Sequence, residues 1–479
     1  MNADTPRPAV PRLVWIATVA AVTAGLVFLW FTWCVFPISD WNEVRLAPAF
    51  ALRHGLTVYA PSGGGPLSTW IYGPLTIVLN LPATFAPSAT SAIQTANAIN
   101  TLTVVIPLVL VCWTVDRLRD APWAYRACAL ALCVLFLPAA TLTFQVADNA
   151  AVACGLISCW CLTRPGTPYR LPAVAAAWCV LSICAKQNAV FLLVAQLIYL
   201  RAFTPRGNAL RHLLWVAALG LPAALACGAY FGFANMWLNL VTIPSRVPWG
   251  ALVDKIALRW PHLLVHLVTP FVLLLLWRRS AFWPARESSL GRSVRCNVIA
   301  FVTFLPIGFL SFFKVGGDTN VFHSHYYLQP LLVATFVAHA GTSAAGPRWL
   351  LAVAAAAVAL RWPEFRELPS QPLTAHLTQA SLVAAKAPQS TWFPNNPVVT
   401  FYSDGKLYNV EDGLATRHLA GIGIREVDFR RHLPAPLTTI VYDVRVTSPF
   451  ALQLLSEFTL ASRTGRWALY QKASSARAP

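Results

Sequence analysis

The sequence predicts an α-helical polytopic membrane protein with a small soluble α/β domain at its C-terminus. Of its 479 residues, 57% are hydrophobic and only 11% are charged, and the mean hydropathy is +0.57, outside the usual range of soluble domains. The apolar residues form runs long enough to cross a bilayer as helices. These runs end near residue 362, where polar, proline and glycine residues become frequent. We therefore expect a transmembrane domain at 1–362 and an extracytoplasmic α/β domain at 363–479.

About eleven segments have the length and composition of transmembrane helices. They are 13–36, 96–115, 124–144, 150–163, 171–185, 189–203, 212–234, 261–277, 297–314, 326–341 and 348–362. The first has the basic flank of a signal peptide, but its apolar stretch is too long and has no convincing cleavage site. We interpret it as an uncleaved first span.

The distribution of basic residues predicts the orientation of these spans. With the N-terminus in the cytoplasm, the inner segments contain sixteen arginines, from Arg7 to Arg348, and the longer outer loops contain eight basic residues. The segment 71–86 is also apolar, but a full crossing there would turn the arginine-rich loops outward. Its prolines and short length favour a juxtamembrane helix in the first outer loop. The sequence thus predicts a multi-pass protein of a bacterial inner membrane, with a periplasmic or extracellular C-terminal domain.

In the C-terminal domain, three segments have the β-branched and aromatic character of strands, namely 398–402, 438–444 and 467–471. Turns are expected at 403–406 and 411–413, where glycine follows acidic residues. The formal net charge of +18 comes mostly from arginines that set topology, and no basic stripe interleaved with aromatic residues tracks a phosphate backbone. A nucleic-acid partner is therefore excluded.

The first outer loop opens with two acidic residues, Asp40 and Glu43. If the segment is helical, their spacing puts both on one face, where they can bind a metal ion or act as a base. The alternative is an ordinary helix N-terminus, with Ser39 or Asp40 as the cap and Glu43 completing a capping box. Acidic residues at a membrane face are unfavourable unless used or paired, which favours the functional interpretation.

Two more candidates lie at predicted outer span ends. Asp148 follows the third span in an apolar stretch. It can be a metal ligand, an orienting group for another side chain, or an ordinary cap of the next helix. Lys186 lies in the tight turn between the fifth and sixth spans. It can hold a phosphate as a point charge or extend along the interface as an ordinary anchoring lysine.

The last outer loop has the densest polar signal in the chain. Two glycines precede its polar groups and let the backbone turn or approach a ligand closely. The candidate substrate-binding residues of this loop are Lys314, Asp318, Asn320, His323 and His325. The two histidines are two residues apart, so on a helix they cannot both ligate one ion. We expect at most one of them to contact a phosphate or a sugar.

These motifs together resemble one enzyme family. The motifs SDWNEV (39–44), WIYGPL (70–75) and KQN (186–188), the position of Asp148, and HYYLQPLL (325–332) are similar to those of polyprenyl-phosphate-dependent GT-C glycosyltransferases, in the bacterial branch of aminoarabinose transferases and protein mannosyltransferases. The resemblance implies a membrane glycosyltransferase in which the first-loop acid, Asp40, is the catalytic base. Glu43 is the second candidate for that role. Asp148 is a further catalytic candidate, and Tyr72 of WIYGPL joins the substrate-binding candidates.

The resemblance also implies the partners. The donor is a sugar on a polyprenyl phosphate that reaches the site laterally from the bilayer, and the acceptor is an envelope glycan, a lipid or a protein. Lys186, Lys314 or a histidine near 323 neutralises the departing lipid phosphate. No cofactor is certain, and a divalent metal ion stays open, with Asp40 and Asp148 as candidate ligands. A tyrosine-glycine-proline stands where a double proline is frequent in the family, and no DxD motif is present at Asp148.

Two other function classes remain as alternatives. A membrane transporter or a flippase for lipid-linked glycans places polar residues near the bilayer midplane, often in repeated halves. Here the charged residues lie at span ends and no repeat is present. The second alternative is a non-catalytic envelope assembly protein that binds partners through its C-terminal domain.

Overall fold

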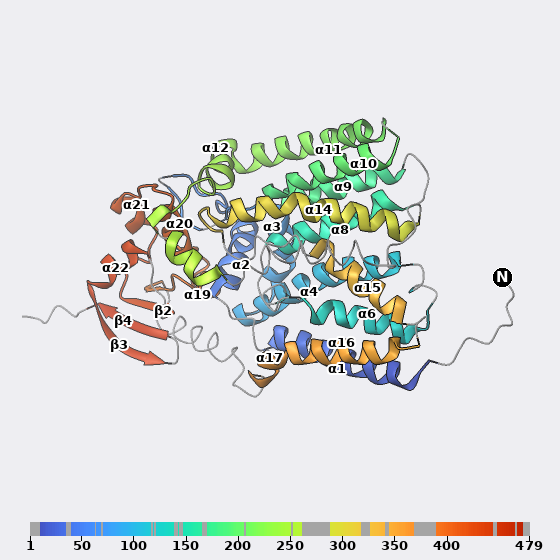
Figure 1. Cartoon of the computed structure of the whole chain (residues 1–479). Helices are drawn as coiled ribbons and strands as arrows, with labels where there is room; N and C mark the ends of the chain where they lie inside the picture. The colour runs from blue at the N-terminus through green and yellow to red at the C-terminus, as the bar shows by residue number, and fades with distance from the viewer. Residues whose placement is uncertain are drawn as a thin grey trace, which may run out of the picture.

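A computed structural model of the chain shows a bundle of apolar helices with a small region of strands and short helices at one end (Figure 1). The structure describes residues 10–34, 40–62, 64–68, 70–115, 118, 121–137, 142, 147–164, 170–205, 207–250, 252–260, 288–317, 326–340, 344–367, 389–443, 448–464 and 467–472. The long helices lie side by side across the view of Figure 1. The strands and the last helices of the chain cover the end of the bundle where α2 also lies.

The apolar helices of the bundle are α1 (Arg12–Cys34), α4 (Ala89–Thr114), α6 (Trp123–Leu135), α8 (Ala147–Thr163), α9 (Arg170–Ala185), α10 (Val190–Phe203), α11 (Gly207–Phe231), α14 (Ser289–Phe312), α15 (Gln329–Ala340) and α16 (Gly346–Leu360). Each overlaps a predicted span, although some begin several residues earlier, as α14 does at Ser289 instead of 297. The predicted span at 261–277 lies outside the described residues. In the described part, α1, α4, α11 and α14 are long and apolar enough to cross a membrane by length and composition. The chain is an integral, multi-pass membrane protein.

Two helix boundaries differ from the prediction because of local chemistry. α4 begins at Ala89 rather than near 96, since Ser88 and Ser91 form a reciprocal capping box in which each side chain bonds the other's backbone N–H. α6 ends at Leu135 rather than near 144, three residues before Pro138. Proline disfavours helical geometry in the residue before it, so the helix ends early.

The predicted juxtamembrane segment is a short helical turn rather than a span. It consists of α3 (Leu75–Asn80) and the 3₁₀ helix η1 (Leu81–Phe85), which together are too short to cross the hydrocarbon core. The first-loop helix α2 (Asp40–Arg53) packs against both of them and against the N-terminal part of α4. Arg53 strengthens this packing, because its guanidinium donates to the Thr84 carbonyl and lies 4.0 Å from the centroid of the Phe85 ring.

The C-terminal region contains a four-stranded sheet in the order β1-β2-β4-β3. Its strands are β1 (Thr391–Trp392), β2 (Thr439–Asp443), β3 (Phe458–Thr464) and β4 (Trp467–Lys472), with β1 parallel to β2 and the other pairs antiparallel. The strands predicted at 438–444 and 467–471 coincide with β2 and β4. The small α/β character predicted for this region is therefore confirmed.

Two local predictions in this region are wrong. The segment 398–402 is not a strand but part of α19 (Pro397–Asp404), which has Pro397 at its first turn and ends at Gly405 with φ of +64°. Proline at the start and a left-handed glycine at the end fix a helix, despite the β-branched residues between them. The turn predicted at 411–413 is instead the first turn of α20 (Glu411–Leu419). The negative charges of Glu411 and Asp412 stabilise this helix by interacting with the positive end of its dipole.

The remaining short elements complete the frame. They are the 3₁₀ turn η2 (Gln187–Ala189), α12 (Phe233–Trp237), the π-helical turn η3 (Leu238–Thr242), α17 (Trp362–Glu367), α21 (Glu426–Arg431) and α22 (Pro449–Leu455). The turn η2 joins α9 to α10, and α12 and η3 follow directly on α11.

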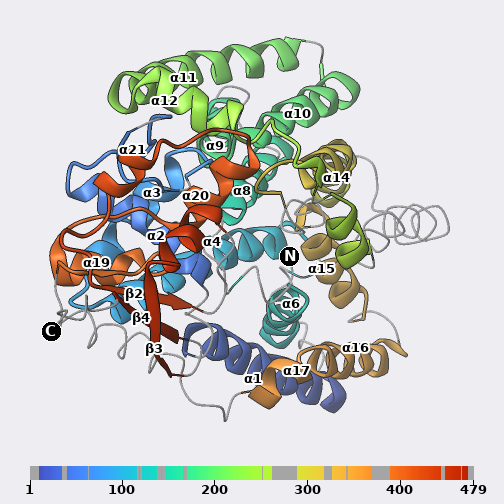
Figure 2. The same ribbon diagram turned by 90° about the vertical axis from the view of Figure 1, so that its left-hand side faces the viewer.

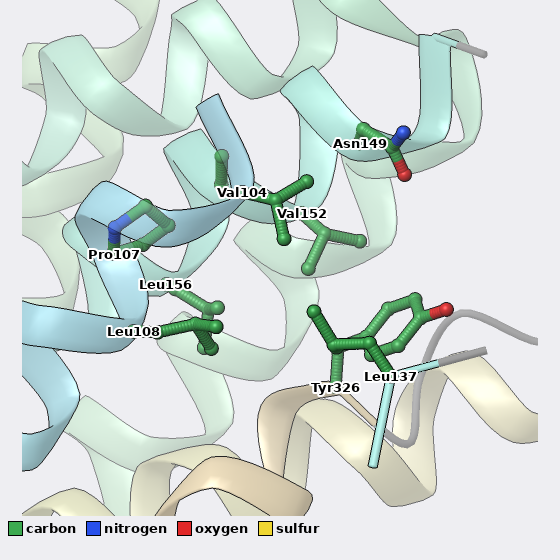
Figure 3. Close-up of a pocket in the computed structure, with 9 residues that line it drawn as sticks. Val104, Pro107, Leu108, Leu137, Asn149, Val152, Leu156 and Tyr326 are labelled. Atoms are coloured by element: carbon green, nitrogen blue, oxygen red, sulfur yellow. The ribbon is translucent and has the colours of Figure 1, made fainter. Parts of the chain in front are cut away.

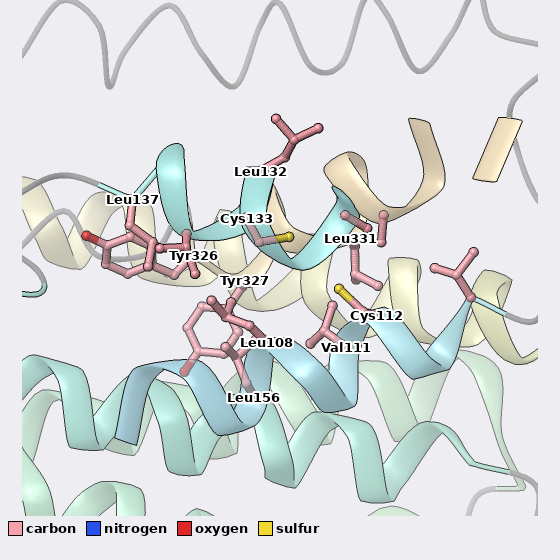
Figure 4. Packing of buried hydrophobic residues seen from close by; sticks show 14 of the residues in the cluster. Leu108, Val111, Cys112, Leu132, Cys133, Leu137, Leu156, Tyr326, Tyr327 and Leu331 are labelled. Carbon is pink, nitrogen blue, oxygen red and sulfur yellow. The ribbon is translucent and has the colours of Figure 1, made fainter. Parts of the chain in front are cut away.

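The centre of the bundle is apolar and closely packed. Leu108, Cys112, Cys133 and Leu331, from α4, α6 and α15, meet side by side in Figure 4. The described cysteines are free thiols, most of them buried, as expected for small apolar packing residues. A cavity of about 20 Å³ between α4 and α8 has Asn149 and Tyr326 among its lining residues (Figure 3). It has room for one water molecule and no more.

The C-terminal region packs directly on the first outer loop. One apolar cluster contains Val44 and Phe50 of α2 together with Phe393, Phe401 and Trp467. Backbone contacts join the same two regions, because Val410 N–H donates to the Leu67 carbonyl and Leu67 N–H donates to the Asn409 side chain. Figure 2, which looks onto this end, shows α19 and α20 over α2 and α3. The first loop is thus covered by a part of the chain more than three hundred residues away.

Candidate functional site

The register between α8 and α9 brings Asp148 and Lys186 together. Ser158 donates to the Ala175 carbonyl and Ser182 donates to the Ala151 carbonyl, each at 2.6 Å, which locks the two antiparallel helices against each other. One further turn along, Asp148 in the first turn of α8 faces Lys186 just after α9. The Lys186 Nζ lies 2.5 Å from the Asp148 Oδ1, and both side chains are 3% exposed. The sequence offered a separate role for each residue; the structure makes them a buried ion pair.

The backbone around Lys186 is held against the WIYGPL segment. Gln187 donates through Nε2 to the carbonyls of Ile71 and Leu240, both at 3.0 Å, and Gly73 N–H donates to the Ala185 carbonyl. A Cβ on Gly73 would lie 2.0 Å from the Cys184 carbonyl oxygen, so no larger residue fits there without movement. This contact explains the glycine between Tyr72 and Pro74: it lets the two loops touch.

Tyr72 connects this ion pair to the first-loop helix. The Lys186 Nζ lies 5.4 Å and the Arg45 Cζ 4.9 Å from the centroid of the Tyr72 ring, both within cation–π range. Arg45 is only 5% exposed and lies on α2, two residues after Glu43. The Tyr72 ring therefore lies close to cations from two separate segments of the chain.

Lys314 adds a third positive charge to this region. Burial and, to a smaller extent, the charge of Lys186 lower the pKa of its ammonium to about 8, and the Asp148 carboxylate opposes the change. The loop that carries it is fixed by Val315 N–H, which donates to the Arg246 carbonyl at 2.8 Å, and by Gly316 at φ of +72°. A Cβ on Gly316 would lie 2.6 Å from Ile71 Cδ1, so this loop also touches the WIYGPL segment.

The first-loop acids lie in α2, as the spacing requires for one helical face. α2 begins at Asp40, whose side chain is outside what the structure describes. Glu43 is fully buried, and its Oε1 accepts a hydrogen bond of 2.7 Å from the Asn396 Nδ2. Asn396 belongs to the turn that precedes α19, so the partner of this carboxylate comes from the C-terminal region.

The last outer loop can be compared with the prediction only in part. Lys314 is near the ion pair, whereas Asp318, Asn320, His323 and His325 lie outside the described residues. Tyr326 and Tyr327 follow that gap and are buried at the start of α15. In the described ranges, no three His, Cys, Asp or Glu side chains gather closely enough to hold a metal ion.

Sequence reasoning missed two residues of this region, Arg45 and Asn396. Arg45 is one of the eight basic residues of the predicted outer loops, and its position two residues after Glu43 is the sequence signal that could have identified it. Asn396 gave no local signal, because 353 positions separate it from its partner Glu43.

The arrangement is chemically suited to an anion. Arg45 and Lys186 lie against the Tyr72 ring, Lys186 pairs with Asp148, and Lys314 lies close enough to that pair to feel both charges, so basic side chains outnumber acidic ones among these residues. Two compact ammonium groups and a guanidinium can neutralise a phosphate.

Comparison with solved structures identifies the architecture. The crystal structure of ArnT from Cupriavidus metallidurans bound to undecaprenyl phosphate matches 97% of this chain and 99% of its own length, with a TM-score of 0.54 and 12% sequence identity. The chain therefore shares its overall fold with ArnT. A weaker likeness, with a TM-score of 0.47 and 12% identity over 96% of this chain and 74% of the other, is to the archaeal oligosaccharyltransferase AglB from Archaeoglobus fulgidus. No protein-family model matches the sequence, and a search of curated proteins finds no significant match.

Proposed function

We propose that this GT-C protein is a membrane glycosyltransferase that moves a sugar from a polyprenyl-phosphate donor to an envelope glycan, lipid or protein acceptor. The observation that carries the proposal is the pair of cations Arg45 and Lys186 at Tyr72, with Lys314 close to Lys186 and Asp148, because these residues provide a phosphate with buried positive charge. The structural neighbour ArnT was crystallised with undecaprenyl phosphate, a ligand of the proposed chemistry.

The proposed reaction is a single displacement at the anomeric carbon. The acceptor oxygen or nitrogen forms a bond to that carbon while the bond from the carbon to the phosphate oxygen breaks. The acceptor's proton passes to a carboxylate of the first-loop helix, with Asp40 as the base and Glu43 beside it in sequence. The lipid phosphate leaves with an added negative charge, which Lys186 and Lys314 stabilise.

In this proposal Asp148 orients Lys186. The ion pair places the Nζ of Lys186 and limits its rotation, so the cation is already in position before the donor enters. Tyr72 supplies an aromatic face next to the same cation. We place the N-terminus in the cytoplasm and the site on the extracytoplasmic face of a bacterial inner membrane, supported by the sixteen inner arginines.

The test is an assay of purified protein in lipid with a panel of polyprenyl-phosphate sugars, measuring the release of polyprenyl phosphate. The assay is run with and without EDTA, which decides whether a divalent metal ion takes part. Asp40→Asn is expected to abolish release, and Asp254→Asn, which changes an exposed outer-loop carboxylate, serves as its matched control.

Release that disappears in Asp40→Asn and persists in Asp254→Asn supports the proposal. No release from any donor by the wild-type protein contradicts it, and movement of an intact fluorescent lipid-linked sugar across the bilayer would indicate a flippase instead. Unchanged release in Asp40→Asn removes Asp40 as the base.

A further inference from the structure

The hydrogen bond between Asn396 and Glu43 joins the first-loop helix to the C-terminal region inside the protein. Glu43 has no exposed surface and Asn396 is 2% exposed, so the 2.7 Å bond between them is shielded from water. A buried hydrogen bond to a charged group is among the stronger polar interactions in proteins. This bond therefore fixes the orientation of the Glu43 carboxylate.

The chemistry of the pair also fixes the orientation of the Asn396 amide. An ionised carboxylate only accepts hydrogen bonds, so the NH₂ end of the amide must face Glu43. The other end, Oδ1, is buried and has no hydrogen-bond partner among the residues that the structure describes. Leaving such an acceptor unsatisfied is unfavourable by about 1–3 kcal/mol.

The position of Asn396 is rigid. Its backbone N–H donates to the Phe393 carbonyl at 3.2 Å, and Pro397 follows as the first residue of α19. α19 packs on α2 through rings, with Phe401 5.2 Å from Phe50 and 5.5 Å from His54 between centroids. The Asn396 amide is thus held against α2 by packing on both sides of it in the chain.

We propose that Asn396 is a positioning residue for the first-loop carboxylates, so that the C-terminal region completes the site. This inference rests on the proposed function, in which α2 supplies the base. Its consequence is that Asn396 affects the chemical step more than the binding of the lipid phosphate, because Lys186, Lys314 and Tyr72 lie on other elements.

The experiment measures sugar transfer and thermal stability of the full-length protein in lipid. Asn396→Ala is expected to lower kcat by about ten- to a hundredfold, the effect of losing a hydrogen bond to a charged group. The KM for the lipid donor is expected to change by less than about threefold. Asn395→Ala is the matched control: Asn395 is the preceding residue, is 8% exposed and has an Oδ1 without a partner in the described ranges. It is expected to leave kcat within about twofold.

A reversed pair separates positioning from simple stabilisation. Asn396→Asp alone places two carboxylates face to face and is expected to be less stable than the wild type. Adding Glu43→Gln restores an amide–carboxylate hydrogen bond, with the carboxylate now on the C-terminal region. Stability is expected to return in the double variant, and transfer is not, because α2 then lacks the Glu43 carboxylate that the inference requires beside Asp40.

Transfer that returns together with stability in the reversed pair overturns the inference, since the bond then acts only through folding. So does an Asn396→Ala protein with wild-type kcat, or one in which kcat and the donor KM worsen in parallel with stability. If Asn396→Ala does not fold, the reversed pair still decides the matter. A wild-type protein without any transfer would overturn the proposed function and this inference with it, whereas an active wild type with an unaffected Asn396→Ala overturns the inference alone.

Discussion

The buried pair of Asp148 and Lys186 gives the sharpest quantitative prediction. At 2.5 Å and an effective dielectric constant of about 20, Coulomb's law gives an attraction of roughly 7 kcal/mol. Most of this is offset by the desolvation of two groups that are each 3% exposed. Removal of one partner leaves the other charge buried, which typically destabilises a protein by about 3–5 kcal/mol.

The test is a double-mutant cycle with Asp148→Asn, Lys186→Met and the double variant. Each single substitution is expected to lower the free energy of unfolding by about 3–5 kcal/mol, and the double variant is expected to lie within about 1 kcal/mol of the wild type. The free energies are measured by denaturant titration of the purified protein in mixed micelles, with the thermal midpoint as a second readout.

The exposed pair of Arg430 and Glu426 supplies the matched control. Their side chains are 44% and 62% exposed, and the same kind of cycle, Glu426→Gln with Arg430→Met, is expected to give a coupling of less than about 1 kcal/mol. Single variants of Asp148 or Lys186 that cost no more than these surface variants would refute the argument from burial. A double variant as unstable as its worse single parent would refute it too.

The same double variant also tests function. If Lys186 neutralises the lipid phosphate, the protein with both substitutions folds normally but releases little polyprenyl phosphate. Transfer that recovers with stability would mean that Lys186 matters only for the structure of the α8–α9 hairpin.

Two further predictions concern the loops around this pair. Burial, the charge of Lys186 and the opposing Asp148 leave Lys314 with a pKa of about 8, so the lysine loses its charge as the pH rises through 8. The KM for the lipid donor should therefore rise by up to about tenfold near pH 9. Lys314→Arg should remove this pH dependence, because arginine stays charged. Gly73→Ala puts a Cβ 2.0 Å from the Cys184 carbonyl oxygen, so it should lower the free energy of unfolding by about 1–3 kcal/mol and reduce transfer. Gly250→Ala is the control: no atom lies within 4 Å of its new Cβ, and it should change neither stability nor transfer. A pH profile of KM that is the same for Lys314→Arg and wild type, or a Gly73→Ala protein as stable as Gly250→Ala, would contradict the respective argument.

Much of the bundle follows from apolar run length alone. A segment such as 13–36 has few ways to satisfy its backbone in a bilayer except as a helix, so its position in the sequence is nearly its position in the fold. Boundaries were less predictable where capping or proline decides them, as at Ser88 and Pro138. The strand wrongly expected at 398–402 has the same cause: two flanking residues, Pro397 and Gly405, outweigh the β-propensity of the residues between them.

The candidate site was predictable at the level of the outer segments but not of contacts. Asp148, Lys186 and Lys314 were each selected because they follow or precede an apolar run, and topology puts such residues at one end of the bundle. That Asp148 and Lys186 pair depends on the register of α8 and α9, which two serine hydroxyls set. No pattern of hydrophobicity encodes that register, because all faces of these helices are apolar.

The contact between Glu43 and Asn396 shows why the covalent order of the chain hides the composition of the site. The proposed boundary near residue 362 separates the two residues in sequence, yet one apolar cluster contains α2 together with Phe393, Phe401 and Trp467. A first-loop helix with a buried carboxylate needs a cover that excludes water and supplies a hydrogen-bond donor. The C-terminal region supplies that cover, and one donor that it brings is the Asn396 amide. The placement of the Glu43 carboxylate on α2 thus depends on a residue from beyond the boundary that the sequence suggests.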